Sequence, residues 1–467
     1  MEVQLPDVPM VKIFSYLDAF SLLQASKVNK NWNKIAESDF LWRRLCLKKW
    51  RFCNFTYERL GTQTWKQLFL HQTKQERRMA CAQSEDFIYK EAAENLGMEP
   101  EMAYLSGSGI TVDGQGKSII CIVSSTCKLY TWDVQEGTMI WSSPVQQSNI
   151  TNLETLPQMH LAITADMERT IKVWNCHDRD PLATCTITRI CFSLKAFLTK
   201  DGPFLMVGDS DGNIHTFTMP ELRDISKVHA FQYSVDLLHC SPDKKWVFAC
   251  GIHQHILPKV FFTECLLRPS EYSTPLYFTV PFASCYRGCW TPRRENRITL
   301  MYRRGSQKKT GFTTFDLTAE SPWGRKDIQA HQIASFLLPV HIDSPNWMGV
   351  GDGSMIVFES GPYLFLFTVN GLMLQRFEGH QSTISNIWVD SLHVLAASVD
   401  GSIHVYMWEE GGHYPYLKRC CHLEYLGSSV TPRCNQVSRA ICDNVSIVRV
   451  VSRVHESNIL VMYALNS

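Results

Sequence analysis

The sequence lacks an excess of charge of either sign, a long apolar run and any closely paired cysteine motif. Its 467 residues carry 46 Lys and Arg against 45 Asp and Glu, so no overall field attracts nucleic acid or an anionic membrane. No apolar leader and no run of about eighteen apolar residues is present, so we expect no membrane span and a location in the cytoplasm, the nucleus or both.

The seventeen cysteines are spread along the chain without C-x-x-C pairs. Structural zinc sites are usually built from such pairs, and disulfides are rare in reducing compartments. We therefore expect neither a metal site nor a disulfide framework, and no cofactor.

Apolar and aromatic residues are plentiful. Hydrophobic residues make up 45% of the chain, with 13 Trp and 24 Phe, which indicates a large packed core and excludes a disordered scaffold. The length suits two to four ordinary domains, or one small domain and one large closed domain.

The first fifty residues predict four short helices. One apolar stripe recurs at positions i, i+3, i+4 and i+7 of a helix: Met10, Ile13, Phe14 and Leu17. Asp7 is placed to cap this helix, and the pair Ser21 and Gln24 has the spacing of a capping box for a second one.

Two further apolar stripes follow at helical spacing, with Asp39 as the expected cap of the last helix: Val28, Trp32 and Ile35, then Leu41, Trp42 and Leu45. Four short helices bury too little surface to be stable alone. We therefore expect part of their apolar surface to bind a partner.

These residues resemble the F-box over about residues 3 to 48. The positions that carry the resemblance are Leu5, Pro6, Ile13, Phe14, Leu17, Leu22, Leu23, Val28, Trp32, Leu41 and Trp42. The resemblance implies that they dock on the Skp-type linker protein of a cullin–RING ubiquitin ligase, with Leu17, Trp32 and Trp42 as the expected anchors. Val8 and Pro9 depart from the family pattern.

Residues 51–85 predict a linker helix. Thr64 and Gln67 repeat the capping-box spacing, and an apolar stripe from Trp65 to Phe69 gives way to a polar run at 74–78. This pattern predicts a stiff helix that is packed at one end and solvated at the other. No Gly/Ser-rich linker is present.

From about residue 100 a repeating unit of strands appears. Its clearest copy runs from Gly379 to Tyr406, with an Asp-Gly turn before its third strand. Similar third strands end at Trp132, Trp174, Phe217, Phe261, Phe315, Phe367, Tyr406 and near Met462. A period of roughly 40 to 45 residues is typical of a β-propeller. The copies at Phe261 and Phe315 are weak, so seven and eight blades both remain open.

The repeat resembles the WD repeat. In that family a buried tetrad stabilises each blade, and the matching residues of the clearest copy are His380, Ser398, Asp400 and Tyr406. The resemblance implies an architectural role for them. Few residues follow the last third strand, so we predict that residues 86–90 supply the outer strand of the last blade and close the ring.

No local motif indicates catalysis. Gly114 to Ser118 lacks the earlier glycine of a phosphate-binding loop, since Thr111 occupies that position.

The densest basic run includes Arg293, Arg294, Arg303 and Arg304. It is either a solvated hairpin, an anion site for a phosphorylated protein substrate, or a weak nuclear-import signal.

The sequence thus predicts an α plus all-β protein: a helical F-box domain at 1–50, linker helices at 51–85 and a propeller at 86–467. Resemblance to the F-box/WD-repeat family implies a non-catalytic, monomeric substrate adaptor of a Skp–cullin–F-box ligase that binds the linker protein and a protein target, with no nucleic acid or membrane partner. The alternatives are a ligase-independent scaffold and a propeller that binds a small molecule or acts as an enzyme.

Overall fold

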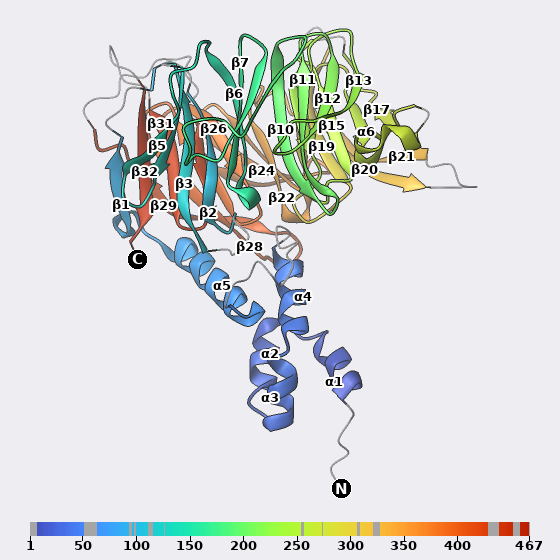
Figure 1. Cartoon of the computed structure of the whole chain (residues 1–467). Helices are drawn as coiled ribbons and strands as arrows, with labels where there is room; N and C mark the ends of the chain where they lie inside the picture. Colours follow the sequence, from blue (N-terminus) through green and yellow to red (C-terminus); the bar gives the residue numbers. More distant parts are fainter. Residues whose placement is uncertain are drawn as a thin grey trace.

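In the computed structural model, a small helical domain is attached to one face of a β-propeller (Figure 1). The structure describes residues 7–50, 63–92, 96–97, 100–110, 115–125, 127–253, 256–272, 274–305, 309–320, 327–427, 439–451 and 458–466. The helices before the propeller are α1 (Asp7–Phe14), α2 (Ala19–Ala25), α3 (Lys30–Ala36), α4 (Asp39–Lys49) and α5 (Trp65–Cys81).

The caps of the short helices differ in part from the prediction. Asp18, not Ser21, caps α2, because its carboxylate accepts the backbone N–H of Ser21 at 2.7 Å. The cap position of α4 is Ser38, one residue before the expected Asp39. The predicted capping box of Thr64 and Gln67 at the start of α5 is confirmed.

Helix α5 is packed along its whole length, so the predicted solvated end is wrong. Its first turns pack on α4, and the side chains of Gln72, Glu76 and Met79 are buried farther along. Within the polar run at 74–78, Lys74, Arg77 and Arg78 are exposed, whereas Glu76 is buried where it meets Trp50 and Lys49.

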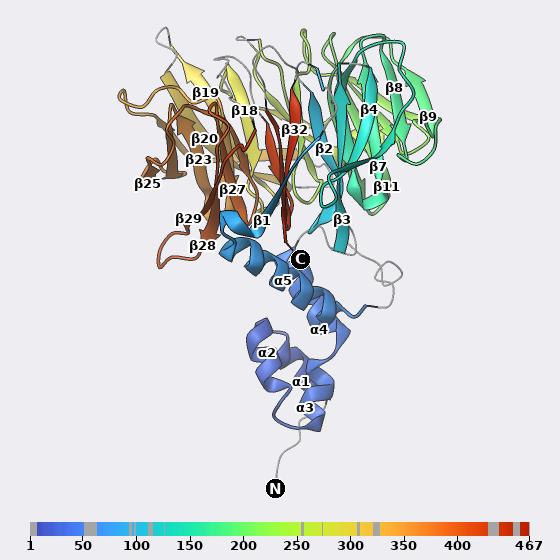
Figure 2. The ribbon, with the colours of Figure 1, turned by 90° about the vertical axis from the view of Figure 1, so that its left-hand side faces the viewer.

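Three polar contacts hold α5 on the propeller. The amide of Asn444 donates to Gln72 Oε1 at 3.2 Å, and the Ser108 hydroxyl donates to Gln75. Arg78 donates to the backbone carbonyl of Asn466, near the end of the chain. The helix is therefore fixed to the ring at both the first and the last blade, as Figure 2 shows from the side.

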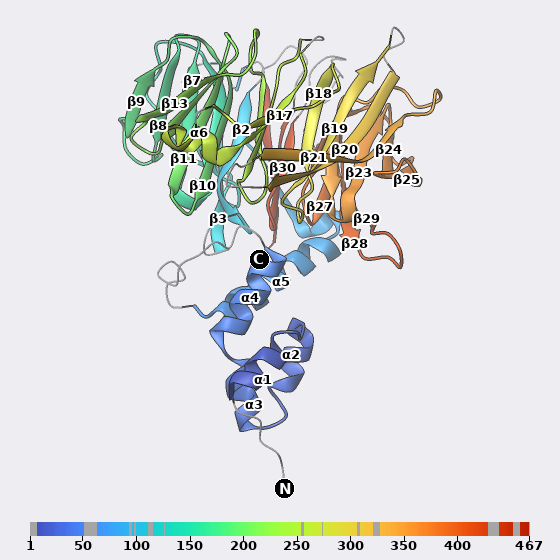
Figure 3. The same ribbon diagram turned by 90° about the vertical axis from the view of Figure 1, so that its right-hand side faces the viewer.

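Eight antiparallel sheets of four strands form the ring, and Figures 2 and 3 show it from two sides. The first four blades are β2 (Glu101–Ser108), β3 (Gln115–Ser124), β4 (Lys128–Asp133) and β5 (Thr138–Ser142); β6 (Ile150–Leu156), β7 (Leu161–Asp166), β8 (Thr170–Trp174) and β9 (Ala183–Thr186); β10 (Cys191–Thr199), β11 (Gly202–Asp209), β12 (Asn213–Thr218) and β13 (Asp224–His229); and β14 (Leu237–Cys240), β15 (Trp246–Cys250), β16 (Lys259–Phe262) and β17 (Tyr277–Thr279).

The other four blades are β18 (Cys285–Trp290), β19 (Arg297–Arg304), β20 (Lys309–Glu320) and β21 (Asp327–Leu337); β22 (Met348–Gly351), β23 (Met355–Ser360), β24 (Tyr363–Thr368) and β25 (Met373–Phe377); β26 (Ile384–Val389), β27 (His393–Ser398), β28 (Ile403–Glu409) and β29 (Tyr416–Leu423); and β30 (Ala440–Cys442), β31 (Ser446–Val451), β32 (Ile459–Leu465) and β1 (Phe87–Glu91). All eight predicted third strands are present.

The two weak repeats are real blades with insertions. In the fourth blade a short helix, α6 (Thr263–Leu267), follows the third strand. In the fifth blade β20 and β21 have 12 and 11 residues, longer than the strands of the other blades. These additions stretch the repeat period around Phe261 and Phe315, which made the copies hard to recognise.

Strand β1 closes the ring by pairing with β32, as predicted for residues 86–90. The antiparallel register runs from Phe87 opposite Leu465 to Glu91 opposite Val461. The pairing joins the start and the end of the propeller in one blade and covers a sheet edge that would otherwise be exposed.

No helix among the described residues is long and apolar enough to cross a membrane. The fifteen cysteines that the structure describes are all free thiols.

Deleting residues 458–467 is expected to destroy the closed ring, because it removes β32 and leaves β1 and β31 with unpaired edges. We expect loss of soluble protein or a strongly lowered Tm by circular dichroism. A chain without residues 1–4 is the control, and equal melting curves for the two deletions would contradict the closure.

The Glu76→Ala substitution is expected to loosen α4 from α5. The buried Glu76 carboxylate accepts the Trp50 indole N–H and pairs with Lys49 at 2.7 Å. Its loss should cost about 2 kcal/mol, typical of a buried hydrogen bond to a charged group. Hydrogen exchange of the α4 and α5 amides measures the effect.

Glu76→Gln keeps an acceptor for Trp50 and is the matched control, so it should cost less than Glu76→Ala. Protection unchanged in Glu76→Ala would show that these contacts do not hold the helices together.

Candidate functional site

The helical domain packs around one apolar core. Phe14, Leu22, Leu41 and Trp42 are almost fully buried in it, and Phe69 of α5 packs on the Trp42 ring with centroids 5.5 Å apart. The Trp42 indole N–H donates to the Ala36 carbonyl at 2.7 Å.

These residues build the domain and are not available to a partner. The expected role of Trp42 as a docking anchor is therefore wrong. Leu17, Leu23 and Trp32 are half-buried and pack on the same core. Leu5 and Pro6 lie outside the described residues.

Large apolar side chains nevertheless lie on the solvent-exposed surface of α1, of α2 and of the turns that follow these helices. Figure 1 places α1, α2 and α3 at the end of the helical domain farthest from the propeller. Of the predicted docking residues, Ile13 and Val28 belong to this surface. Three exposed residues were missed by the prediction: Val8, Tyr16 and Phe20, the last with 69% of its side chain exposed. We call these five residues the apolar tip.

Helical periodicity identifies the residues that face the core. The apolar tip could therefore be found from the sequence only by looking for large apolar residues outside that core stripe. On α1, the stripe of Met10, Phe14 and Leu17 turns towards the core. Ile13 lies about a fifth of a turn from that stripe and Val8 almost half a turn, while Tyr16 lies in the turn that follows α1. Large apolar residues off the core stripe are therefore the signal.

The four arginines of the basic run do not form one site. Arg293 and Arg294 lie in the β18–β19 turn, whereas Arg303 and Arg304 end β19. A strand rises about 3.3 Å per residue, so the eight residues of β19 keep the two pairs on opposite faces of the ring.

Local partners engage three of these four arginines. Arg293 pairs with Asp352 at 2.8 Å, and Arg294 lies 3.9 Å from Asp316. The Arg303 guanidinium stacks on Tyr286 at 4.6 Å. Of the alternatives for the basic run, an anion site in which all four arginines converge is therefore not formed.

Charged side chains from the first, innermost strands of the blades are paired as well. Lys195 and Glu154 are 2.7 Å apart, and Arg439 lies 3.9 Å from Glu101. The Arg287 guanidinium stacks on the Trp347 ring at 3.9 Å. Burial and the nearby cations Lys195 and Arg287 lower the pKa of His239 to about 4, so this side chain is neutral at pH 7.

The predicted tetrad of the clearest repeat is formed only in part. His380 Nδ1 and the Ser398 hydroxyl are hydrogen-bonded, but Asp400 accepts the backbone N–H and hydroxyl of Ser402 at 2.9 and 2.7 Å instead of pairing with His380. The Tyr406 hydroxyl is buried without a hydrogen-bond partner. Asp400 caps its own tight turn, and a tyrosine has no indole N–H to offer the serine.

Parts of the same kind of tetrad are formed in other blades. Asp209 accepts hydrogen bonds from both Asn213 and His215, and the Trp174 indole N–H donates to Thr164 at 3.0 Å. Burial lowers the pKa of His380 to about 4 and keeps it neutral. These groups are buried and mutually bonded, which is consistent with an architectural role.

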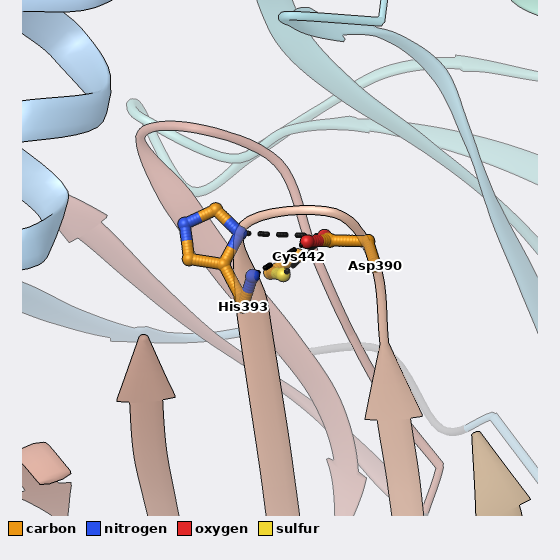
Figure 4. A group of neighbouring side chains, drawn as sticks. All are labelled: Asp390, His393 and Cys442. Atoms are coloured by element: carbon orange, nitrogen blue, oxygen red, sulfur yellow. Dashed lines mark hydrogen bonds and ion pairs between the residues drawn. The ribbon is translucent and has the colours of Figure 1, made fainter. Parts of the chain in front are cut away.

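One cluster has the residue types of a metal site. Asp390 at the end of β26, His393 at the start of β27 and Cys442 at the end of β30 bring ligand atoms within 4.8 Å of one another (Figure 4). The Asp390 Oδ2 atom lies 3.3 Å from His393 Nδ1 and 3.7 Å from Cys442 Sγ.

Protein donors already account for this geometry. Asp390 Oδ1 accepts the backbone N–H groups of Leu392 and His393 at 2.8 and 2.6 Å, and Trp388 donates to Oδ2 at 3.2 Å. Burial raises the pKa of the Cys442 thiol well above its usual value, so it stays protonated. The cluster fits a cap of the β26–β27 turn.

Comparison with known proteins gives two family matches. The F-box-like family model matches residues 3–48, and the model of the WD domain, G-beta repeat, matches residues 371–406. The second match includes the repeat identified above as the clearest copy.

Two proteins are similar over the whole chain. Human F-box/WD repeat-containing protein 12 is 58% identical over 468 residues, which is 100% of both chains. Mouse F-box/WD repeat-containing protein 15 is 43% identical over 100% of this chain and 99% of its own.

Among solved structures, the computationally designed Ika8 protein aligns with a TM-score of 0.51 at 14% identity, over 79% of this chain and 98% of its own. That likeness concerns the fold alone. The two full-length relatives establish more: the chain belongs to the F-box/WD repeat-containing protein family, whose members are typically substrate adaptors and generally non-catalytic.

Proposed function

We propose that the chain is the substrate-recognition component of a Skp–cullin–F-box ubiquitin ligase. The apolar tip docks on a Skp-type linker protein, which connects it to a cullin–RING ligase, and the propeller binds the protein target. The observation that carries the proposal is the apolar tip itself, because five large apolar side chains are exposed on a domain that matches the F-box-like family, and exposed apolar surface of this kind is typical of protein-binding sites.

The adaptor acts by proximity. It holds a target near a separate enzyme that carries ubiquitin, so that an encounter between two proteins becomes a reaction within one complex. The chain itself contributes binding and orientation. The packing of α5 against both α4 and the ring supports this role, since it fixes the apolar tip relative to the propeller.

The proposal includes a single copy of the chain in each complex and a location in the cytoplasm, the nucleus or both. The balance of 46 basic and 45 acidic residues supports a protein partner over nucleic acid or membrane.

The Ile13→Asp substitution is expected to weaken binding of a purified Skp-type linker protein at least tenfold. Ile13 is 50% exposed, so the change should leave the fold intact, whereas burying a carboxylate in an apolar interface costs several kcal/mol, more than the ~1.4 kcal/mol of a tenfold loss. Isothermal titration calorimetry with the full-length chain measures the loss.

Ile140→Asp is the matched control, because Ile140 is 49% exposed on the outer strand β5 of the propeller. It should bind the linker protein as the wild type does. Equal affinity for wild type and Ile13→Asp would overturn the docking surface.

The ligase role is tested in proteasome-inhibited cells. Linker and cullin should co-purify with the wild-type chain and with Ile140→Asp, and be lost with Ile13→Asp. If neither co-purifies with the wild type, the ligase proposal fails.

A further inference from the structure

Five exposed apolar side chains lie on five different connections in the first four blades. Val145 is in the β5–β6 connection, Met167 in the β7–β8 turn, Ile190 in the β9–β10 connection, Tyr233 in the β13–β14 connection and Ile252 in the β15–β16 turn. Exposure reaches 54% for Met167 and 72% for Ile252. We call these five residues the apolar rim.

The apolar rim lies on the face of the propeller opposite to the helical domain. Helix α5 contacts Ser108 at the end of β2 and Asn444 in the β30–β31 turn, so it covers the face where first strands lead into second strands. Successive strands are antiparallel, so the turns into third strands and the connections between blades lie at the other face. In Figure 1 the helices extend from one side of the ring and leave this face uncovered.

Backbone hydrogen bonds join the connections of the apolar rim to one another. Met167 donates to the Asn149 carbonyl at 3.0 Å, and Ile187 donates to the Arg169 carbonyl at 2.9 Å. Ser210 in turn donates to the Ile190 carbonyl at 3.0 Å. These contacts link three blades into one continuous surface.

The fourth blade is joined through side chains. The rings of Tyr233 and His253 stack with centroids 4.1 Å apart and planes 12° apart. The Asp236 carboxylate accepts the backbone N–H of Ile252 at 2.8 Å. The apolar rim is therefore a pre-formed surface, which reduces the entropy lost on binding.

The charges around the apolar rim do not favour a phosphorylated ligand. The described residues of its connections and of the β11–β12 turn between them include two arginines, Arg169 and Arg189, and three carboxylates. Arg189 pairs with Asp211 at 2.6 Å, and Arg169 donates to the Thr188 carbonyl at 3.2 Å.

Two lysines of neighbouring strands also reach these connections and are engaged there, since Lys172 donates to Gln146 and Lys259 donates to the Ala230 carbonyl at 2.8 Å. A phosphate site would need converging cations that are not already bonded to protein partners.

We propose that the apolar rim binds the target protein through an unphosphorylated, extended segment that carries apolar side chains. The assignment deepens the proposed function and rests on it, since it names the class of target. The occupant follows from the chemistry of the surface: apolar side chains with paired charges match an apolar segment of low charge, and a row of connections along an arc suits an extended chain.

The test uses the purified full-length chain and a synthetic array of 15-residue peptides. Apolar sequences are presented in unmodified form, with flanking phosphoserines, and with their apolar residues replaced by serine. Peptides that bind are then measured by fluorescence polarisation against two triple variants of the chain.

The rim variant carries Met167→Ser, Tyr233→Ser and Ile252→Ser. The matched control carries Met139→Ser, Tyr277→Ser and Ile140→Ser, the same residue types exposed on the outer strands β5 and β17. All six side chains are at least 42% exposed, so both variants should fold, and circular dichroism checks this.

We expect unmodified apolar peptides to bind the wild type and the control within about twofold of each other, and the rim variant at least tenfold more weakly, which corresponds to ~1.4 kcal/mol. The proposal is overturned if binding requires phosphoserine, if the rim variant binds as the wild type does, or if no peptide binds. Light scattering that shows a dimer lost in the rim variant would instead assign the surface to a second copy.

Linker binding is measured on the same variants and separates the two proposals. The rim variant should keep full affinity for the Skp-type linker protein. Peptide binding without linker binding would refute the ligase role and leave the rim assignment standing, whereas linker binding without peptide binding would refute the rim alone.

Discussion

The pairing of β1 with β32 is the constraint on which the rest of the structure depends. It joins residues almost four hundred positions apart in the chain and converts an open row of blades into a ring. Helix α5 ends at Cys81 and β1 begins at Phe87, so little chain separates the helix from the closing blade. The strand that completes the propeller therefore also determines where the helical domain leaves it.

Polar contacts restrict the orientation of α5 on the ring more than apolar packing alone would. An apolar stripe can slide along a flat surface at small cost, but buried polar groups lose their partners if they shift. Gln72 bonds Asn444 in the β30–β31 turn of the propeller, and Glu76 bonds Lys49 and Trp50 at the end of α4. Arg78 bonds the backbone carbonyl of Asn466 near the end of the chain. These contacts favour one orientation of the helical domain on the ring.

The sequence predicted the order of elements well, because the third strands carry local signals that can be recognised even in the weak repeats of the fourth and fifth blades. It predicted contacts between distant segments poorly. The polar run of α5 resembled a solvated face, since nothing local reveals that Gln72 and Glu76 are buried in contacts with distant segments. Helical periodicity likewise identified Phe14 and Trp42 as important, but a stripe found that way is the core face, so the exposed Tyr16 and Phe20 were missed.

The two exposed apolar surfaces are separated by the thickness of the ring and, beyond it, by the length of the helical domain (Figure 1). A strand of five or six residues spans about 17–20 Å, and β7 has six residues, so a segment bound at the apolar rim stands about that far from the face that carries α5. Because α5 packs on α4 and is hydrogen-bonded to the ring, these contacts oppose a bend of the helical domain that would shorten this distance. In the proposed ligase, a target bound at the apolar rim would have to present its modified lysines on a segment that extends past the edge of the propeller. The bound segment and the modified residues would then be different parts of the target, and the span between them would select which lysines react.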